Sequence, residues 1–163
     1  MEQKPLFKTT FSKGPKIGVH FHDEAKGFKV SLSESSQFHT AFFTEVDKNL
    51  IDKLLAWLDA YSQKKLLPLD FLPKLPLSAF KEKTLNALKE IPFGKVVSYS
   101  ELASLAGSER AARAVGTICK LNRYPLFVPC HRVIAKGNSL GGFAFGSSIK
   151  RALLEFEEST QVQ

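Results

Sequence analysis

Three prolines within one short segment constrain the fold of this 163-residue chain more than any other feature. Pro68, Pro73 and Pro76 lie in the run Leu67–Pro76. Proline fixes φ and has no amide hydrogen, so this run cannot form a regular helix. We interpret it as the linker between two domains, residues 1–75 and 76–163, with a rigid loop inside one domain as the alternative. The chain is long enough for one or two small domains, each with its own core.

The residues before the linker predict a small domain of sheet and helix. Two short runs with β propensity, 16–21 and 27–32, flank a turn-forming segment at 23–27. Apolar side chains then recur at helical spacing over residues 47–62, namely Leu50, Leu54, Trp57, Leu58 and Tyr61. The predicted fold class is therefore mixed α/β (α+β).

The residues after the linker predict a helix-turn-helix. Ser98, with Glu101 three residues later, forms a capping box that opens a short helix, and Gly107 is placed to end it. Ser108 is expected to cap a second helix, 109–120, that carries several cations. Two short helices joined at a glycine, the second of them basic, are typical of a DNA-binding helix-turn-helix.

The predicted second helix has one side with very little side-chain bulk. Arg113 projects from a surface that is otherwise formed by Ala112, Ala114 and Gly116, while the apolar stripe of the helix consists of Ala111, Val115 and Ile118. A bare helix surface can approach a partner closely, and the minor groove of DNA, roughly 6 Å wide, admits such a surface best. Tight packing of the alanines inside the protein is the alternative.

Charge is distributed unevenly along the chain. The net charge is +7, and no Asp or Glu occurs between Arg110 and Arg151, where eight cations stand: Arg110, Arg113, Lys120, Arg123, Arg132, Lys136, Lys150 and Arg151. A surface of one sign suits a polyanion such as nucleic acid. A solvated basic face without a partner is the alternative.

The pentapeptide Pro129–Val133 contains the candidate nucleophile. Cys130 is followed directly by His131 and Arg132, and an imidazole and a cation both favour the reactive thiolate over the thiol. A buried structural cysteine is the alternative. Adjacent side chains on an extended backbone point to opposite sides, so a water between Cys130 and His131 is better geometry than a direct pair. This geometry also counts against a papain-like protease, whose histidine is distant in sequence.

Other residues bear on metals and location. Cys119 and Cys130 are expected to be free thiols, because no secretory signal is visible and a reducing, cytoplasmic compartment is therefore expected. No apolar run approaches the ~20 residues of a membrane span. His20, His22 and His39 lie close in sequence without a cysteine partner, so we interpret them as surface or strand residues and predict no metal site.

Several motifs together resemble the methylated-DNA–protein-cysteine methyltransferases, also called O6-alkylguanine-DNA alkyltransferases. These motifs are Ser98-Tyr99, the block Ala111–Gly116, Asn122, Pro125 and the pentapeptide Pro129–Val133. The resemblance is close from about residue 80 to residue 157, and earlier residues match only in a loose order of strands and helix. It implies a ribonuclease H-like domain over residues 1–75 and a winged helix-turn-helix domain over 76–163 that binds DNA and accepts an alkyl group.

The resemblance also implies direct reversal of alkylation damage in double-stranded DNA. An O6-alkylguanine, or an O4-alkylthymine, would be flipped out of the duplex into a pocket. The alkyl group would pass to Cys130 in one displacement, and the stable thioether would end the activity of that molecule. No cofactor takes part, and the chain is expected to act as a monomer from the minor-groove side.

Residue roles carry over from the family by motif. His131 resembles the base that takes the thiol proton through a water, and Glu157 the carboxylate that orients this imidazole. Asn122 resembles a brace of the active-site turn, and Tyr99 a proton donor to guanine. Arg113 resembles the finger that fills the vacated base stack, and the other expected DNA contacts are Ala111, Ala112, Ala114, Gly116 and Arg132. The expected pocket residues are Cys119, Val133, Phe143, Ala144, Phe145 and Lys150.

Departures from the family pattern concern the pocket. Cys119 replaces an apolar side chain that packs against guanine, Phe143 a frequent tyrosine, and Phe145 a frequent glycine. The range of alkyl groups is therefore the open question. The amino-terminal cysteines that bind zinc in some relatives are absent. The rival interpretations are a lesion-binding protein without transferase activity, which Cys130 opposes, and a helix-turn-helix regulator, which leaves the pentapeptide unexplained.

Overall fold

The computed structural model describes residues 3–25 and 27–158, and the chain divides between Leu75 and Pro76 into two compact units. Residues 65–78, which include the prolines of the predicted linker, contain neither helix nor strand. Among the described residues, no helix has both the length and the apolar character needed to cross a membrane.

The first unit is a four-stranded mixed sheet with one helix. Its elements are β1 (Phe7–Thr10), β2 (Ile17–Glu24), β3 (Gly27–Glu34), β4 (His39–Phe42) and α1 (Lys48–Ser62). The strand order is β1-β4-β2-β3, in which β2 pairs antiparallel with β3 and parallel with β4. The predicted β-runs are confirmed as β2 and β3. The short strands β1 and β4 have no distinct sequence pattern, and the sequence did not predict them.

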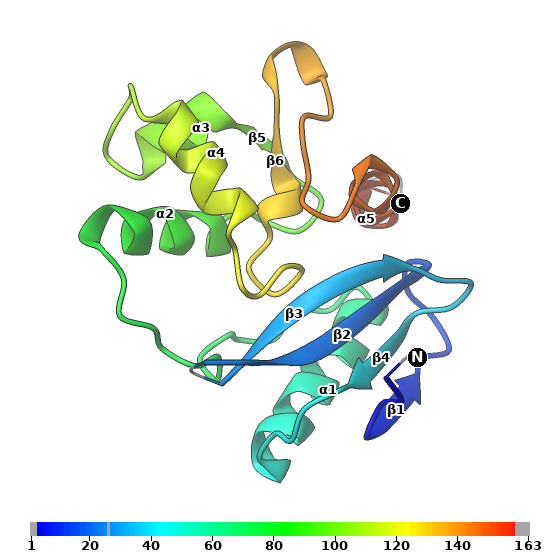
Figure 1. The fold of residues 1–163 in the computed structure, drawn as a ribbon. Coiled ribbons are helices and arrows are strands. Elements are labelled where there is room, and N and C mark those ends of the chain that lie inside the picture. Colours follow the sequence, from blue (N-terminus) through cyan, green and yellow to red (C-terminus); the bar gives the residue numbers. More distant parts are fainter. Residues whose placement is uncertain (1–2, 26, 159–163) are drawn as a thin grey trace. The chain divides into compact units, whose positions relative to one another are not determined.

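The core of the first unit lies between the sheet and α1 (Figure 1). Alternate residues of β2 and β3 are buried, namely Ile17, Val19, Phe21, Phe28, Val30 and Leu32. The predicted helix is confirmed as α1, and its Leu54, Trp57, Leu58 and Tyr61 are buried. The Asp47 carboxylate accepts hydrogen bonds from the Asn49 and Leu50 amides and so caps the start of α1. The opposite sheet face carries polar side chains.

The second unit is mostly helical. It contains α2 (Ala79–Lys89), β5 (Val97–Ser98), α3 (Tyr99–Leu105), α4 (Ala112–Lys120), a 3₁₀ helix (Cys130–Arg132), β6 (Val133–Ile134), a 3₁₀ turn (Lys136–Asn138) and α5 (Ser147–Glu158). β5 and β6 pair in parallel. This short ladder joins the start of α3 to the segment that follows Cys130 (Figure 1).

Local sequence explains how α3 begins and ends. The Ser98 hydroxyl accepts the Glu101 amide at 3.1 Å, which confirms the predicted N-cap. Gly107 has a φ of +89°, a left-handed conformation that glycine adopts without a steric penalty. The predicted start of the next helix is wrong by three residues. Residues 108–111 form a turn closed by the Ala111 amide on the Ser108 carbonyl at 3.1 Å, and α4 begins only at Ala112.

Candidate active site

Cys130 lies at the end of a buried loop in the second unit. The loop residues Tyr124, Leu126, Phe127 and Val128 are each at most 6% exposed, and Cys130 is 5% exposed. These apolar side chains hold the backbone rigidly below the thiol. The buried run in the sequence therefore fixes the position of Cys130.

Asn122 connects this loop to the thiol. Its Nδ2 donates to the Val128 carbonyl at 2.8 Å and to the Cys130 Sγ at 3.2 Å, and its Oδ1 accepts the Tyr124 amide at 3.1 Å. A single side chain thus holds both ends of the turn and contacts the sulfur. This geometry is what the bracing role predicted for Asn122 requires.

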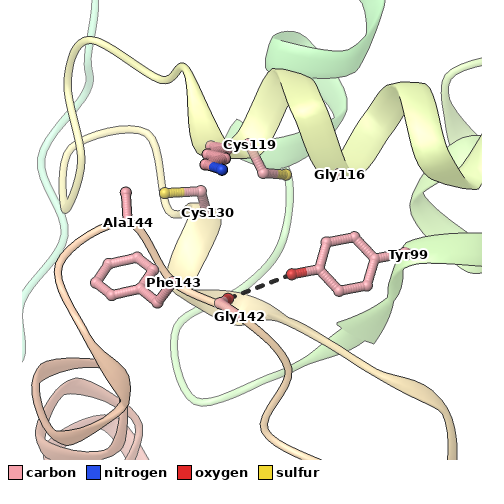
Figure 2. A pocket seen from close by; sticks show the side chains of 8 residues that line it. Tyr99, Gly116, Cys119, Cys130, Gly142, Phe143 and Ala144 are labelled. Carbon is pink, nitrogen blue, oxygen red and sulfur yellow. Dashed lines mark hydrogen bonds between the residues drawn. The ribbon is translucent and has the colours of Figure 1, made fainter.

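The Cys130 thiol faces a cavity of about 280 Å³ (Figure 2). The Tyr99 hydroxyl donates to the Gly142 carbonyl at 3.4 Å across one side of the cavity. The residues that line the cavity are Tyr99, Gly116, Cys119, Lys120, Cys130, Gly142, Phe143 and Ala144. They come from α3, α4, the 3₁₀ helix and the loop before α5, so the cavity brings together segments that are distant in sequence.

Burial keeps Cys130 in its thiol form. Burial raises the pKa of Cys130, and the Asn122 hydrogen bond and the positive charge of Lys150 only partly oppose this effect. Burial also raises the pKa of Cys119 to about 12, with a further contribution from Cys130. Since the thiolate is the nucleophile, Cys130 needs a base that removes its proton when substrate is in place.

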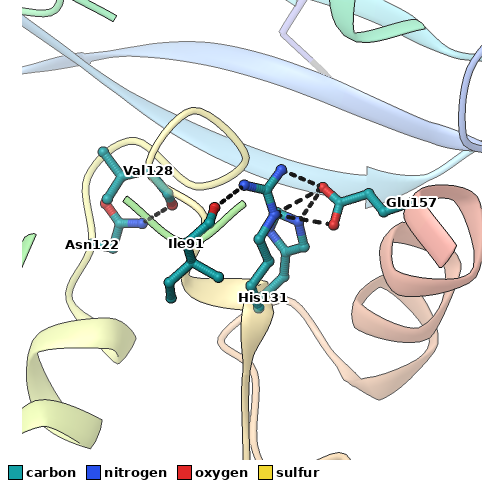
Figure 3. A network of polar contacts seen from close by, with 6 residues as sticks. Ile91, Asn122, Val128, His131 and Glu157 are labelled. Atoms are coloured by element: carbon teal, nitrogen blue, oxygen red, sulfur yellow. Dashed lines mark hydrogen bonds and ion pairs between the residues drawn. The ribbon is translucent and has the colours of Figure 1, made fainter. Parts of the chain in front are cut away.

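His131 belongs to a buried network that can supply this base (Figure 3). Its Nε2 lies 2.9 Å from Glu157 Oε1, and the Arg132 Nη2 donates to the same oxygen at 2.7 Å. The Arg132 Nη1 donates to the Ile91 carbonyl at 2.8 Å. His131 is fully buried, and its Nδ1 has no hydrogen-bond partner among the described residues.

The carboxylate of this network stays ionised. Burial alone would raise the pKa of Glu157, but the charges and hydrogen bonds of His131 and Arg132 lower it to about 2. The Glu157 carboxylate therefore orients the His131 ring and stabilises a proton on it. Arg132 holds the carboxylate from the other side.

Lys150 connects the segments around the cavity through hydrogen bonds. Its fully buried Nζ donates to the Val133 carbonyl at 2.6 Å and to the Gly142 carbonyl at 3.1 Å. Burial lowers the pKa of Lys150, while the nearby thiols Cys130 and Cys119 oppose this effect. The ammonium thus links α5 to β6 and to the loop that carries Gly142.

Comparisons with known proteins agree with this geometry. Residues 79–159 match the family described as 6-O-methylguanine DNA methyltransferase, DNA binding domain. The methylated-DNA–protein-cysteine methyltransferase of Methanosarcina acetivorans is 34% identical over 147 residues, which cover 90% of this chain and 89% of that protein. The chain belongs to this family.

Other members of the methylated-DNA–protein-cysteine methyltransferase family are matched over shorter stretches. The human protein is 37% identical over 109 residues, 63% of this chain and 53% of that protein, so the match spans about half of its length. The solved structure of the Mycobacterium tuberculosis O6-methylguanine methyltransferase has a TM-score of 0.63, 30% identity, and coverage of 88% of this chain and 93% of that chain. The M. tuberculosis protein OGT in complex with DNA also gives a TM-score of 0.63, with 30% identity and coverage of 87% and 93%.

Most of the residues predicted for catalysis in this family member lie together. Asn122 donates to the Cys130 sulfur, His131 follows Cys130 in the same 3₁₀ helix, Glu157 hydrogen-bonds to His131, and Tyr99 lines the cavity. The prediction that Arg132 contacts DNA is not supported by its position. It is 6% exposed, and its guanidinium binds Glu157 and the Ile91 carbonyl. The Arg132 side chain therefore makes its contacts inside the protein, although its segment of the sequence is basic.

The predicted DNA-binding surface on α4 is partly exposed. Arg113 and Ala114 are exposed, while Ala111, Ala112 and Gly116 are half-buried. Gly116 also lines the cavity, where a Cβ in its place would lie 3.9 Å from the Tyr99 ring. The bare side of α4 thus continues from the protein surface to the cavity.

The predicted pocket residues divide into two groups. Cys119, Phe143 and Ala144 line the cavity, but Val133, Phe145 and Lys150 do not. The Val133 side chain is fully buried, and Phe145 packs edge-on against Phe143 with ring centroids 5.7 Å apart. Sequence reasoning missed Lys120 and Gly142 as lining residues. Helical spacing could have identified Lys120, four residues after Gly116, whereas no local signal marks Gly142.

Proposed function

We propose that this protein repairs alkylated DNA by transferring the alkyl group of O6-alkylguanine to Cys130, once per molecule. The observation that carries this proposal is the relation of Cys130 to the buried network. The thiol faces the cavity, and in the described part of the chain the buried His131 Nδ1 has no hydrogen-bond partner, while Glu157 binds the other ring nitrogen. A water between Sγ and Nδ1 would complete the path for the proton.

Each step follows from the charges of the network. The thiol proton passes through the water to His131 Nδ1, and the ionised Glu157 stabilises the imidazolium. The thiolate attacks the alkyl carbon, a C–S bond forms, and the C–O6 bond breaks with its electron pair remaining on guanine. Tyr99 supplies a proton to the leaving base. The thioether product has no base-catalysed route back, so the reaction is stoichiometric. O4-alkylthymine is a second substrate of the same chemistry.

In this proposal, α4 and the elements next to it bind the DNA. We place α2, α3, α4 and the β5–β6 ladder in the winged helix-turn-helix class, and the first unit, with its mixed sheet and α1, in the ribonuclease H-like class. The bare side of α4, with Arg113 exposed, fits the minor groove of double-stranded DNA. Arg113 would occupy the stack where the flipped guanine had been.

The setting of the reaction is part of the proposal. The protein acts as a monomer, because one unit supplies the cavity, the thiol and the buried network. A cytoplasmic location fits two cysteines that are both free in the structure.

Mass spectrometry of the intact protein tests the proposal. After incubation with duplex DNA that contains O6-methylguanine, the protein should gain one methyl group, and peptide mapping should place it on Cys130. Cys130→Ser should gain none, whereas Cys119→Ser should still be methylated. Binding of the lesion without a mass change would instead favour a lesion-binding protein without transferase activity. Release of several guanines per protein would contradict the single-turnover mechanism.

A further inference from the structure

The sheet of the first unit brings three histidines to its polar face. In β2 the residues Ile17, Val19 and Phe21 are buried, so Gly18, His20 and His22 point to the opposite face. β4 runs parallel to β2 with His39 in register with Gly18. His20 and His39 therefore stand on either side of a glycine, and their ring centroids are 5.6 Å apart.

Gly18 allows the two rings to lie directly over the strand. A Cβ built at this glycine would lie 2.6 Å from His39 Cε1, 2.7 Å from His20 Nε2 and 2.8 Å from His39 Nε2, so it would collide with both rings. Both Nε2 atoms therefore lie close to the same point above Gly18, and any side chain at position 18 would displace them.

Hydrogen bonds leave the His39 Nε2 with a free lone pair. The Nδ1 of His39 lies 3.2 Å from the Gln37 carbonyl and 3.0 Å from the Ser35 Oγ. A carbonyl only accepts, so Nδ1 carries the hydrogen of the neutral ring and Nε2 is the basic nitrogen. Histidines that bind metals typically have this arrangement, with the second nitrogen donating to a carbonyl or carboxylate.

His20 Nε2 is the second candidate ligand atom, and neutral imidazole is the metal-binding form. The Ser33 Oγ lies 3.2 Å from His20 Nε2, and metal binding would exchange this hydrogen bond for a coordinate bond.

We propose that His20 and His39 bind one divalent transition-metal ion, Zn²⁺ or a similar imidazole-preferring ion, and so connect β2 to β4. Among the described residues, no set of three or more His, Cys, Asp or Glu side chains is placed to hold a metal. The protein thus supplies two nitrogen ligands, and water completes the coordination. Structural zinc sites usually have four protein ligands, so this site binds its ion more weakly and exchanges it readily.

The third histidine stays outside this pair. The Nε2 of His22 lies 2.8 Å from the Ser31 Oγ, and its ring stacks on Phe43 with centroids 5.2 Å apart.

The imidazole ligands also determine the order of affinity for different metal ions. Imidazole sites prefer Cu²⁺ to Zn²⁺ and Zn²⁺ to Mn²⁺, and Mg²⁺ prefers oxygen ligands, so excess Mg²⁺ should not compete.

Calorimetric titration of the full-length protein with ZnCl₂ tests the proposal, after treatment with a chelator and its removal. One equivalent of Zn²⁺ should bind, and His20→Asn and His39→Asn should each lower the affinity by at least about tenfold. Gly18→Ala should have a similar effect while both imidazoles remain, because its Cβ would collide with both rings and displace them. Cys130→Ser is the matched control for thiol binding and should keep the affinity.

Nuclear magnetic resonance provides a second measurement that needs no variant. The chain has four histidines, so their ring signals can be assigned individually. Substoichiometric Ni²⁺ should broaden the signals of His20 and His39 and leave those of His131 sharp. Zn²⁺ affinity unchanged in both histidine variants, affinity lost in Cys130→Ser, or broadening confined to His131 would each overturn the proposal. None of these outcomes bears on alkyl transfer to Cys130.

Discussion

At the scale of single residues, the resting protein protects its nucleophile. Burial raises the pKa of Cys130, and Asn122 is the side chain that donates a hydrogen bond to its sulfur. The thiol therefore reacts only where a base and a bound substrate act together. This arrangement suits a protein that is consumed by one reaction, because adventitious electrophiles meet a neutral thiol.

Removal of the Asn122 amide should raise the pKa of Cys130 further. In Asn122→Ala we expect methyl transfer at neutral pH to slow by about tenfold, the equivalent of one hydrogen bond of about 1.4 kcal/mol. The pH dependence of Cys130 alkylation by iodoacetamide, measured by peptide mapping, should move to higher pH. Asn86→Ala is the control, since Asn86 is exposed on α2 and does not line the cavity. A slower reaction with an unchanged pH profile would mean that Asn122 only supports the loop.

The buried Glu157 carboxylate should make the free energy of unfolding depend on pH in the acidic range. The folded-state pKa of Glu157, about 2, lies below its usual 4.5, so the ionised form stabilises the fold above pH ~4.5. This contribution, roughly 3 kcal/mol at neutral pH by linkage, should disappear as the pH falls from 4.5 towards 2. The difference in unfolding free energy between the native protein and Glu157→Gln should shrink over that window. Glu155→Gln, an exposed site on the same helix, should show no such trend.

Single residues also mark where the sequence predicts the site and where it does not. The prediction of a bridging water assumed an extended backbone at Cys130 and His131, but these two residues lie in a 3₁₀ helix. The water between them therefore stays a prediction. The resemblance to the family implied that Arg132 contacts DNA, but Arg132 is buried and binds Glu157. Its partner Glu157 lies 25 residues further on, and only the packing of α5 brings them together.

At the scale of elements, the sequence predicted where α1 and α3 lie. Apolar periodicity located α1 within residues 47–62, and the capping box at Ser98 located the start of α3. α4 begins three residues late, because the backbone after Gly107 uses Ser108 to close a turn and not to cap a helix. The strands β1 and β4 were missed because four residues each carry too little periodicity.

The exposed arginine of α4 allows a test of base flipping. If Arg113 fills the vacated stack, Arg113→Ala should slow repair of duplex DNA far more than transfer from free O6-methylguanine. Arg110→Ala is the matched control, since Arg110 is exposed just before α4. It should weaken DNA binding at all sequences and lower the salt slope by about one unit. Equal losses on duplex and free base in Arg113→Ala would exclude the stacking role.

The loop before α5 should control the size of the alkyl group. Phe143 lines the cavity, and Phe145 supports it edge-on at 5.7 Å. Overpacking costs ~1–3 kcal/mol, so the native protein should react poorly with O6-benzylguanine. We expect Phe143→Ala to speed this reaction by about tenfold and Phe145→Ala to have a smaller effect. The assay is the loss of methyl-transfer capacity after incubation with the benzylated base. A larger gain in Phe145→Ala would show that Phe145 sets the size of the cavity.

At the scale of the whole molecule, the charge is divided between surface and interior. The chain carries a net charge of +7, yet Arg132 and Lys150, two of the eight cations between residues 110 and 151, are buried and bind internal acceptors. A count of cations in the sequence therefore overstates the surface charge that DNA meets. The structure separates cations that assemble the site from cations that face solvent.

This division predicts the salt dependence of DNA binding. Six cations of the block remain exposed or half-buried: Arg110, Arg113, Lys120, Arg123, Lys136 and Arg151. If this block supplies the phosphate contacts, a plot of log K against log salt concentration should have a slope no steeper than about −5, since each contact contributes about −0.9. Fluorescence anisotropy with an unmodified duplex measures this slope. Lys136→Gln should reduce the magnitude of the slope by about one, whereas Lys53→Gln, on α1 of the first unit, should leave the slope unchanged.

A slope near −7 would mean either that buried cations reach the DNA or that cations outside the block share in binding. An equal effect of Lys53→Gln would decide for the second explanation, because net charge alone would then set the affinity.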